Sequence, residues 1–201
     1  MLWSCGYSQW PNRQHWHVVC GALDAQPWPH DEDEATVRVS RGGLAGPTLR
    51  EGLLTAERVL RRIARTCLRH INGVGTLEQA CADMGEGTDP SVLDAFLYAS
   101  CPPGRQEAQM SEHTDPGVLT LTRVSDCPGL EILSPASATW VAVEALAAAD
   151  DVLVFGGEQL ETATGGRVRA ARHRVAPPPE RCEGQERNSV VFELRVPEGA
   201  L

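Results

Sequence analysis

The chain has 201 residues and a formal net charge of −9, with 42% apolar and 22% charged residues. This length is enough for one domain with its own core, and the composition is ordinary for a globular protein. The acidic balance argues against a nucleic-acid partner, whose phosphates require a basic face, and against an anionic membrane surface.

Neither the N-terminus nor the cysteines indicate export. The first ten residues lack the basic region and the apolar core of a secretory signal, and no apolar run reaches the ~18 residues of a membrane span. The seven cysteines are odd in number, widely spaced and without a C-x-x-C motif. This pattern favours free thiols over a disulfide scaffold or a zinc ribbon. We therefore expect a soluble, cytoplasmic protein.

The first predicted element is a strand in the stretch NRQHWHVV, where His15 and His17 flank Trp16. Alternate residues of a strand project to one face, so the two imidazoles have the placement of metal ligands. No third ligand stands nearby in the sequence. We therefore predict a strand whose histidines are exposed or hydrogen-bonded.

Two helices are expected next. Thr48 and Glu51 form a capping box, apolar residues recur at helical spacing up to Ile71, and Asn72-Gly73 is a termination signal. Arginines occupy most of the other face, so this is an amphipathic helix that packs one side on a core. A shorter helix is expected over residues 76–83, with a second capping box formed by Thr76 and Gln79.

From residue 94 the pattern changes to short β-prone runs separated by Gly, Pro and Asp. Such runs with turns between them are typical of an all-β sandwich or barrel. We expect the stretch ALAAADD to be a loop and the whole chain to be one domain in which helices buttress a β core. The expected strands lie within residues 94–99, 117–124, 129–134, 140–143, 151–155, 167–175 and 188–196.

A candidate metal site begins with SEHTDPGVLTL, in which His113 and Asp115 stand at i and i+2. In extended backbone both side chains project to the same face, although Asp-Pro-Gly is also a good turn on its own. His173, in the strand-like run RAARHRV, is the candidate third ligand. Two imidazoles and one carboxylate form the facial triad of non-haem Fe(II) oxygenases, which leaves coordination positions open.

Arg187 and Ser189, in ERNSVVFELR, are again at i and i+2 and share a face of a predicted strand. A guanidinium fork with a hydroxyl suits a carboxylate, which arginine binds in a bidentate manner. Because a buried arginine requires an anionic partner, a ligand carboxylate is a candidate for this position.

The order of these motifs resembles that of the Fe(II)/2-oxoglutarate-dependent dioxygenases, and more narrowly their isopenicillin N synthase-like branch. The similarity extends over residues 94–196. Its most specific part contains a strand, a Gly-Glu-x-Leu turn, a Thr-x-Gly segment and a strand ending in His-Arg-Val, in the family's order. The phrases that carry it are HTDPGVLTL, GLEILSPASATWVAV, DVLVFGGEQLETATGGRVRAARHRV and RNSVVFELR.

The resemblance implies a mostly β fold with N-terminal helices, in which a double-stranded β-helix (jelly roll) is buttressed by α-helices. Residues 1–93 are then an N-terminal helical support region, truncated relative to the family, and residues 94–201 are the oxygenase domain. The iron ligands, which are also the catalytic residues, are identified as His113, Asp115 and His173, and the cosubstrate-binding residues as Arg187, Ser189 and Tyr98.

The same resemblance implies an enzyme that uses Fe(II), 2-oxoglutarate and dioxygen, with ascorbate as an accessory reductant. Its expected reaction is hydroxylation or another oxidation, such as desaturation or ring closure, of a C–H bond in a small organic substrate. Two alternatives stay open. One is an iron oxidase of the same fold that does not use 2-oxoglutarate, and the other is a non-catalytic, truncated jelly roll that serves as a binding module.

Overall fold

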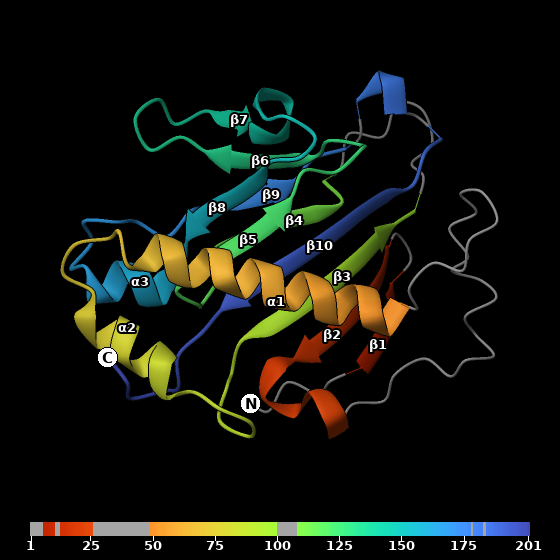
Figure 1. Ribbon diagram of the computed structural model, residues 1–201. Helices are drawn as coiled ribbons and strands as arrows, with labels where there is room; N and C mark the ends of the chain where they lie inside the picture. Colours follow the sequence, from red (N-terminus) through yellow and green to blue (C-terminus); the bar gives the residue numbers. More distant parts are fainter. Residues whose placement is uncertain (1–5, 11–12, 26–48, 100–107, 178, 183) are drawn as a thin grey trace.

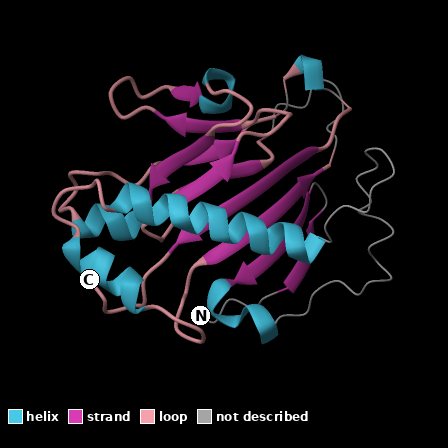
Figure 2. Cartoon of the chain, in the orientation of Figure 1, coloured by secondary structure: helices cyan, strands magenta, loops and turns pink. Residues whose placement is uncertain are grey.

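The computed structural model describes residues 6–10, 13–25, 49–99, 108–177, 179–182 and 184–201. Two antiparallel sheets form a jelly-roll core, and helices lie along one side of the larger sheet (Figures 1 and 2). The expected fold, mostly β with buttressing helices, is therefore confirmed.

The larger sheet has six strands. Their spatial order is β1 (Gly6–Trp10), β2 (Arg13–Val19), β3 (Val92–Tyr98), β10 (Arg187–Leu194), β5 (Leu119–Arg123) and β8 (Val152–Gly156). The smaller sheet has four strands. Their order is β4 (Met110–His113), β9 (His173–Val175), β6 (Leu130–Leu133) and β7 (Trp140–Ala142). From β3 onward the chain passes repeatedly between the sheets, which places distant segments side by side.

Strand β10 shows how the sequence divides the two faces of the larger sheet. Phe192 and Leu194 belong to the apolar core, whereas Ser189 and Glu193, at alternate positions, project to the opposite face. The pairing of β10 with β3 and β5 continues this division across the sheet. We call the face with Ser189 and Glu193 the inner face and the apolar face the outer face.

Helix α1 (Leu49–Leu68) covers the outer face and runs across the strands (Figure 1). Its buried residues join the core cluster with those of the outer face, so the amphipathic pattern places the helix on the sheet. The remaining helices are shorter. They are α2 (Gly75–Asp83), α3 (Glu158–Ala163), and the 3-10 helices η1 (Cys20–Ala25), η3 (Val143–Leu146) and η4 (Glu180–Cys182).

Both predicted helices are confirmed in position, and α2 ends at Asp83 as predicted, but two other signals are not borne out. Helix α1 ends at Leu68, before the predicted Asn72-Gly73 signal, and Thr48 lies outside the described residues. The predicted Thr76/Gln79 capping box is wrong, because α2 begins at Gly75 and its N-cap residue makes no side-chain hydrogen bond. The Gln79 amide instead donates to the Asp83 carboxylate at 2.8 Å.

Most predicted strands are confirmed, including β2 in the HWH stretch. The run 167–175 is the exception, because only His173–Val175 is a strand. Gly165 and Gly166 adopt positive φ angles of 60° and 80° after α3, and the segment that follows them is not paired in a sheet. The loop expected over ALAAADD begins within η3. The sequence pattern did not predict β1 or β4.

Strands β1 and β2 belong to the larger sheet, with β2 paired to β3 along its length. The described residues before position 94 therefore supply sheet as well as helix. A boundary between residues 93 and 94 stays a prediction. No helix in the described part of the chain combines the length and the apolarity required to cross a membrane.

Neighbouring residues of α1 provide a matched test of this packing. Leu60 is 6% exposed and belongs to the core, whereas Val59 is 43% exposed. We expect Leu60→Ala to lower the free energy of unfolding by about 2–5 kcal/mol, because it leaves a cavity against the sheet. Val59→Ala should change it by less than about 0.5 kcal/mol. Urea unfolding of both variants measures this, and equal effects would contradict the placement of α1.

Candidate functional site

The structure brings the three predicted metal ligands together. Strand β4 pairs with β9 so that His113 lies opposite His173, and their ring centroids are 4.3 Å apart. Asp115 follows β4 in the turn and lies between them. Its Oδ1 is 3.6 Å from His113 Nε2, and its Oδ2 is 3.7 Å from His173 Nε2. Three donor atoms from segments about sixty residues apart thus converge on one point.

The backbone fixes which nitrogen each histidine offers. His113 Nδ1 lies 2.8 Å from the Ser111 carbonyl oxygen, and His173 Nδ1 lies 2.9 Å from that of Ala171. A carbonyl only accepts, so each Nδ1 carries the proton and each Nε2 has a free lone pair directed at Asp115. Metal-binding histidines are commonly oriented by such a hydrogen bond from the other ring nitrogen.

A hydroxyl on the inner face holds the Asp115 carboxylate. Thr120, on β5, donates to Asp115 Oδ2 at 2.5 Å. The turn itself is fixed by the Gly117 N–H, which donates to Glu193 Oε1 at 2.5 Å, and by the Glu158 N–H, which donates to the Asp115 carbonyl at 2.9 Å. One hydrogen bond therefore orients the carboxylate, and two others hold the backbone of its turn.

Gly157 allows the start of α3 to reach this turn. A Cβ atom at Gly157 would lie 2.3 Å from the Gly117 carbonyl oxygen and 2.8 Å from that of Asp115. Both contacts are with backbone, which has no freedom to move aside. The Gly-Glu-x-Leu phrase thus has a structural reason: glycine permits the approach, and Leu160 is fully buried in the core.

The site is buried on one side and open on the other. The His173 side chain is 8% exposed and packs against Phe155, with ring centroids 4.9 Å apart, whereas the His113 side chain is 37% exposed. Burial lowers the pKa of His173, and the nearby Asp115 carboxylate opposes this shift only in part. The imidazole is therefore neutral at neutral pH, as a metal ligand must be.

Two imidazoles and a carboxylate match the donor set of non-haem Fe(II) oxygenases. The three residues offer one donor atom each, so an ion with six coordination positions would keep positions open for further ligands. The residues present thus fit Fe(II). The arrangement resembles neither a closed structural zinc site, which has four protein ligands, nor an oxygen-only site for magnesium or calcium.

Arg187 lies on the inner face at the start of β10, as expected, and it has an internal anionic partner. Its guanidinium nitrogens Nη1 and Nη2 each lie 3.2 Å from Glu144 Oε1, and Nη1 also donates to the Cys127 carbonyl at 2.6 Å. Glu144 accepts further hydrogen bonds from backbone N–H groups, those of Ser125, Gly129 and Leu130. The buried charge of Arg187 is thus neutralised by the protein itself.

The other two expected cosubstrate residues lie beside Arg187. Tyr98 pairs with it across β3 and β10, and the guanidinium carbon is 5.8 Å from the centre of the tyrosine ring. Burial raises the pKa of Tyr98 to about 12, so the phenol stays protonated. Ser189 Oγ lies 3.4 Å from Thr122 Oγ1. The three predicted residues therefore form one polar group on the inner face.

Sequence reasoning missed Glu144 and Thr120. Glu144 is the one charged residue in the apolar run WVAVEAL, which is a sequence signal for a buried carboxylate with a partner. The sequence does not show that this partner is Arg187, because the two residues lie in different segments. Thr120 stands in an alternating strand where threonine is common, and its link to Asp115 depends on the turn between them.

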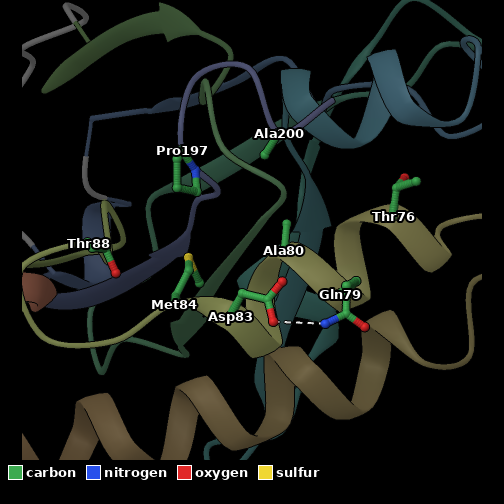
Figure 3. A pocket seen from close by; sticks show the side chains of 8 residues that line it. All are labelled: Thr76, Gln79, Ala80, Asp83, Met84, Thr88, Pro197 and Ala200. Carbon is green, nitrogen blue, oxygen red and sulfur yellow. Dashed lines mark hydrogen bonds between the residues drawn. The ribbon is translucent and has the colours of Figure 1, made fainter.

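A pocket of about 500 Å³ lies elsewhere, between α2 and the C-terminal segment (Figure 3). Its lining residues are Thr76, Gln79, Ala80, Asp83, Met84, Thr88, Pro197 and Ala200. None of the ligand triad or the Arg187 group contributes to it, so we do not connect this pocket with the site.

Comparison with known proteins places these features in a family. The sequence model of the 2OG-Fe(II) oxygenase superfamily matches residues 88–196, which is more than half of the chain and includes all three predicted ligands. No curated protein matches the chain.

Solved structures show the same fold. A rice dioxygenase for auxin oxidation (DAO) superposes with a TM-score of 0.64 at 21% identity, over 97% of this chain and 60% of the other. A full-length Neurospora crassa protein in complex with alpha-KG and 5-formyluracil gives 0.69 at 19% identity, over 96% and 62%. JOX2, in complex with 2OG, Fe and JA, gives 0.67 at 17% identity, over 94% and 51%. This chain therefore spans about half to three fifths of the length of these proteins.

Substitution of Gly157 tests the packing that holds the Asp115 turn. We expect Gly157→Ala to lower the free energy of unfolding by about 1–3 kcal/mol, because the methyl group collides with two carbonyl oxygens. The matched control is Gly52→Ala in α1, where nothing lies within 4 Å of the added carbon. The control should be up to about 1 kcal/mol more stable than the parent. If both variants have the same free energy of unfolding in chemical denaturation, Gly157 does not pack closely against the Asp115 turn.

Removal of the Glu144 carboxylate tests the buried ion pair. We expect Glu144→Ala to lower the free energy of unfolding by about 3–5 kcal/mol, because it leaves Arg187 charged and unpaired in the interior. Glu131→Ala, which breaks the partly exposed pair with Arg174, should cost less than about 1 kcal/mol. If the Glu144 variant is as stable as the Glu131 variant in urea titrations, Glu144 does not neutralise Arg187.

Proposed function

The chain belongs to the 2OG-Fe(II) oxygenase superfamily, and we propose that it is an Fe(II)- and 2-oxoglutarate-dependent dioxygenase of a small organic substrate. The observation that carries this proposal is the convergence of His113 Nε2, His173 Nε2 and the Asp115 carboxylate. The Nδ1 hydrogen bonds support it, because they leave both lone pairs directed to the same place.

In this proposal His113, Asp115 and His173 hold Fe(II). The chemistry that Fe(II) supplies with 2-oxoglutarate and dioxygen is oxidative decarboxylation to succinate and carbon dioxide, coupled to oxidation of a substrate C–H bond. Thr120 keeps the Asp115 carboxylate oriented, and Phe155 covers the buried side of His173. The exposed side of His113 is where a substrate would approach.

Arg187, Ser189 and Tyr98 are proposed to bind the distal carboxylate of 2-oxoglutarate. Among the described residues, Arg187 Nε is buried and has no hydrogen-bond partner, so it is the N–H group that we assign to this carboxylate. Glu144 then serves to fix the guanidinium from its other edge. The Tyr98 phenol, protonated at neutral pH, is able to donate as well.

One observation favours a second candidate, an iron oxidase that does not use 2-oxoglutarate. Glu144 already neutralises Arg187, so the arginine does not require a ligand carboxylate to offset its charge. The triad therefore supports iron more directly than Arg187 supports 2-oxoglutarate.

The substrate is proposed only as a class. Proteins of this fold have been solved with molecules as small as 5-formyluracil and JA. We infer a small organic molecule here, and we propose hydroxylation as the reaction, with desaturation and ring closure as alternatives.

Succinate formation tests the proposed function. Protein purified anaerobically receives Fe(II), 2-oxoglutarate and ascorbate, and air is then admitted without any added substrate. We expect slow, uncoupled succinate formation in the parent and in His70→Ala, an exposed histidine after α1. We expect only background in His113→Ala, because a ligand is lost.

The outcomes separate the candidates. Equal succinate formation in His113→Ala and the parent would overturn the metal assignment. Fe(II) binding that depends on His113 without succinate from any protein would favour the second candidate. For Arg187, the double variant Glu144→Gln/Arg187→Met is used, because it removes both buried charges together. Loss of succinate with retained Fe(II) binding in this variant supports the cosubstrate role.

A further inference from the structure

A second cluster of side chains that could bind a metal lies on β2 and β3 of the larger sheet. His15 and His17 project to the inner face of β2, and Asp94 lies directly opposite His17 on β3. Asp94 Oδ1 is 2.7 Å from His15 Nε2 and 2.6 Å from His17 Nδ1. The sequence shows no third ligand near the HWH motif because strand pairing supplies it from 77 residues away.

We propose that His15, His17 and Asp94 form a second site for a divalent transition-metal ion of the zinc type. One ligand atom from each residue lies within 4.8 Å of the other two. The side chains are 21%, 10% and 16% exposed, so the site is partly buried and accessible to an ion. Two imidazoles and one carboxylate are ligands that zinc takes in sites with an open fourth position.

The charge of the cluster suits a cation. The Asp94 carboxylate supplies negative charge, and each imidazole is able to supply one lone pair to a cation. Without a metal, both imidazoles must direct a proton at the same oxygen. One divalent ion would replace these two protons.

The spacing requires only a small adjustment. Ligand atoms on tetrahedral zinc are roughly 3.3 Å apart, so each histidine nitrogen must move away from Asp94 Oδ1 by about 0.7 Å. The His15 ring stacks on Phe96, with centroids 4.3 Å apart and planes inclined by 15°. This contact allows the imidazole to slide within its own plane and opposes tilting. By contrast, the nitrogens of the first site are already 3.6 and 3.7 Å from the Asp115 oxygens.

The second site lies on the inner face of the larger sheet, and the first site contacts this face through the hydrogen bond from Thr120 to Asp115. Asp94 is in register with Val191 on β10, which is in register with Thr122 on β5. Adjacent strands are 4.7–4.9 Å apart, so Asp94 and Thr122 are separated by about 10 Å. Thr120, two residues from Thr122, holds Asp115. The two sites share no ligand, and neither requires the other.

Metal stoichiometry tests the proposal. Metal-free full-length protein is titrated with Zn²⁺ and, separately, with Co²⁺, whose visible absorption reports the ligand geometry. We expect two equivalents in the parent and in His70→Ala, and one equivalent in Asp94→Asn, in His15→Ala/His17→Ala and in His113→Ala. A parent that binds one equivalent, lost in His113→Ala and unchanged in Asp94→Asn, would overturn the second site.

The result also separates this proposal from the proposed function. If the residues of the first site do not bind metal, the parent should bind one equivalent of metal, which is lost in Asp94→Asn and kept in His113→Ala. Because a variant in β2 is able to affect folding, a measurement on the parent is added. Zn²⁺ should protect His15 and His17 from carbethoxylation by diethyl pyrocarbonate, measured by peptide mass spectrometry, while the exposed His70 reacts as before. Unchanged modification of His15 and His17 at saturating Zn²⁺ would contradict the proposal.

Discussion

The site depends on one constraint, the position of the Asp115 carboxylate between two imidazoles. The β4–β9 pairing sets the histidines, and the turn after β4 sets the carboxylate. Thr120 orients its oxygen, and Gly157 lets α3 close against the turn. The β4–β9 pairing and the approach of Gly157 to the turn join segments that are far apart in the chain, whereas Thr120 and Asp115 are only five residues apart. The jelly-roll topology is therefore what brings His173 to the other two residues. A one-residue change of register in β4 would direct His113 to the other face.

The Arg187–Glu144 pair is the second organising feature. Both side chains are buried, and the pair is linked to backbone N–H groups of the loop before β6. A buried pair of this kind is weak evidence for stability, because desolvation offsets much of the attraction. The pair instead serves to orient Arg187, since it fixes the plane of the guanidinium on the inner face. Because the Nη1 and Nη2 groups of Arg187 are bonded to Glu144 and to the Cys127 carbonyl, its Nε–H group remains for a ligand.

The sequence predicted the parts of the fold that have local periodicity. Alternation in β10 indicated which side chains share a face, and the motif order predicted three candidate ligands that the fold brings together. It did not predict the start of α2, because Thr76 lies within the helix and does not cap it. It also did not predict Glu144 as the partner of Arg187 or Asp94 as the partner of the HWH histidines. Those contacts arise from strand pairing and loop packing, which leave no mark on neighbouring residues.

A crystal structure of anaerobically prepared protein with Fe(II), with diffraction recorded on both sides of the iron absorption edge, tests whether the triad binds iron. We expect an anomalous peak within bonding distance of His113 Nε2, His173 Nε2 and the Asp115 carboxylate, with the two Nδ1 atoms still bonded to the Ser111 and Ala171 carbonyls. Iron bound elsewhere on the chain, or no ordered iron at saturating concentration, would contradict this assignment.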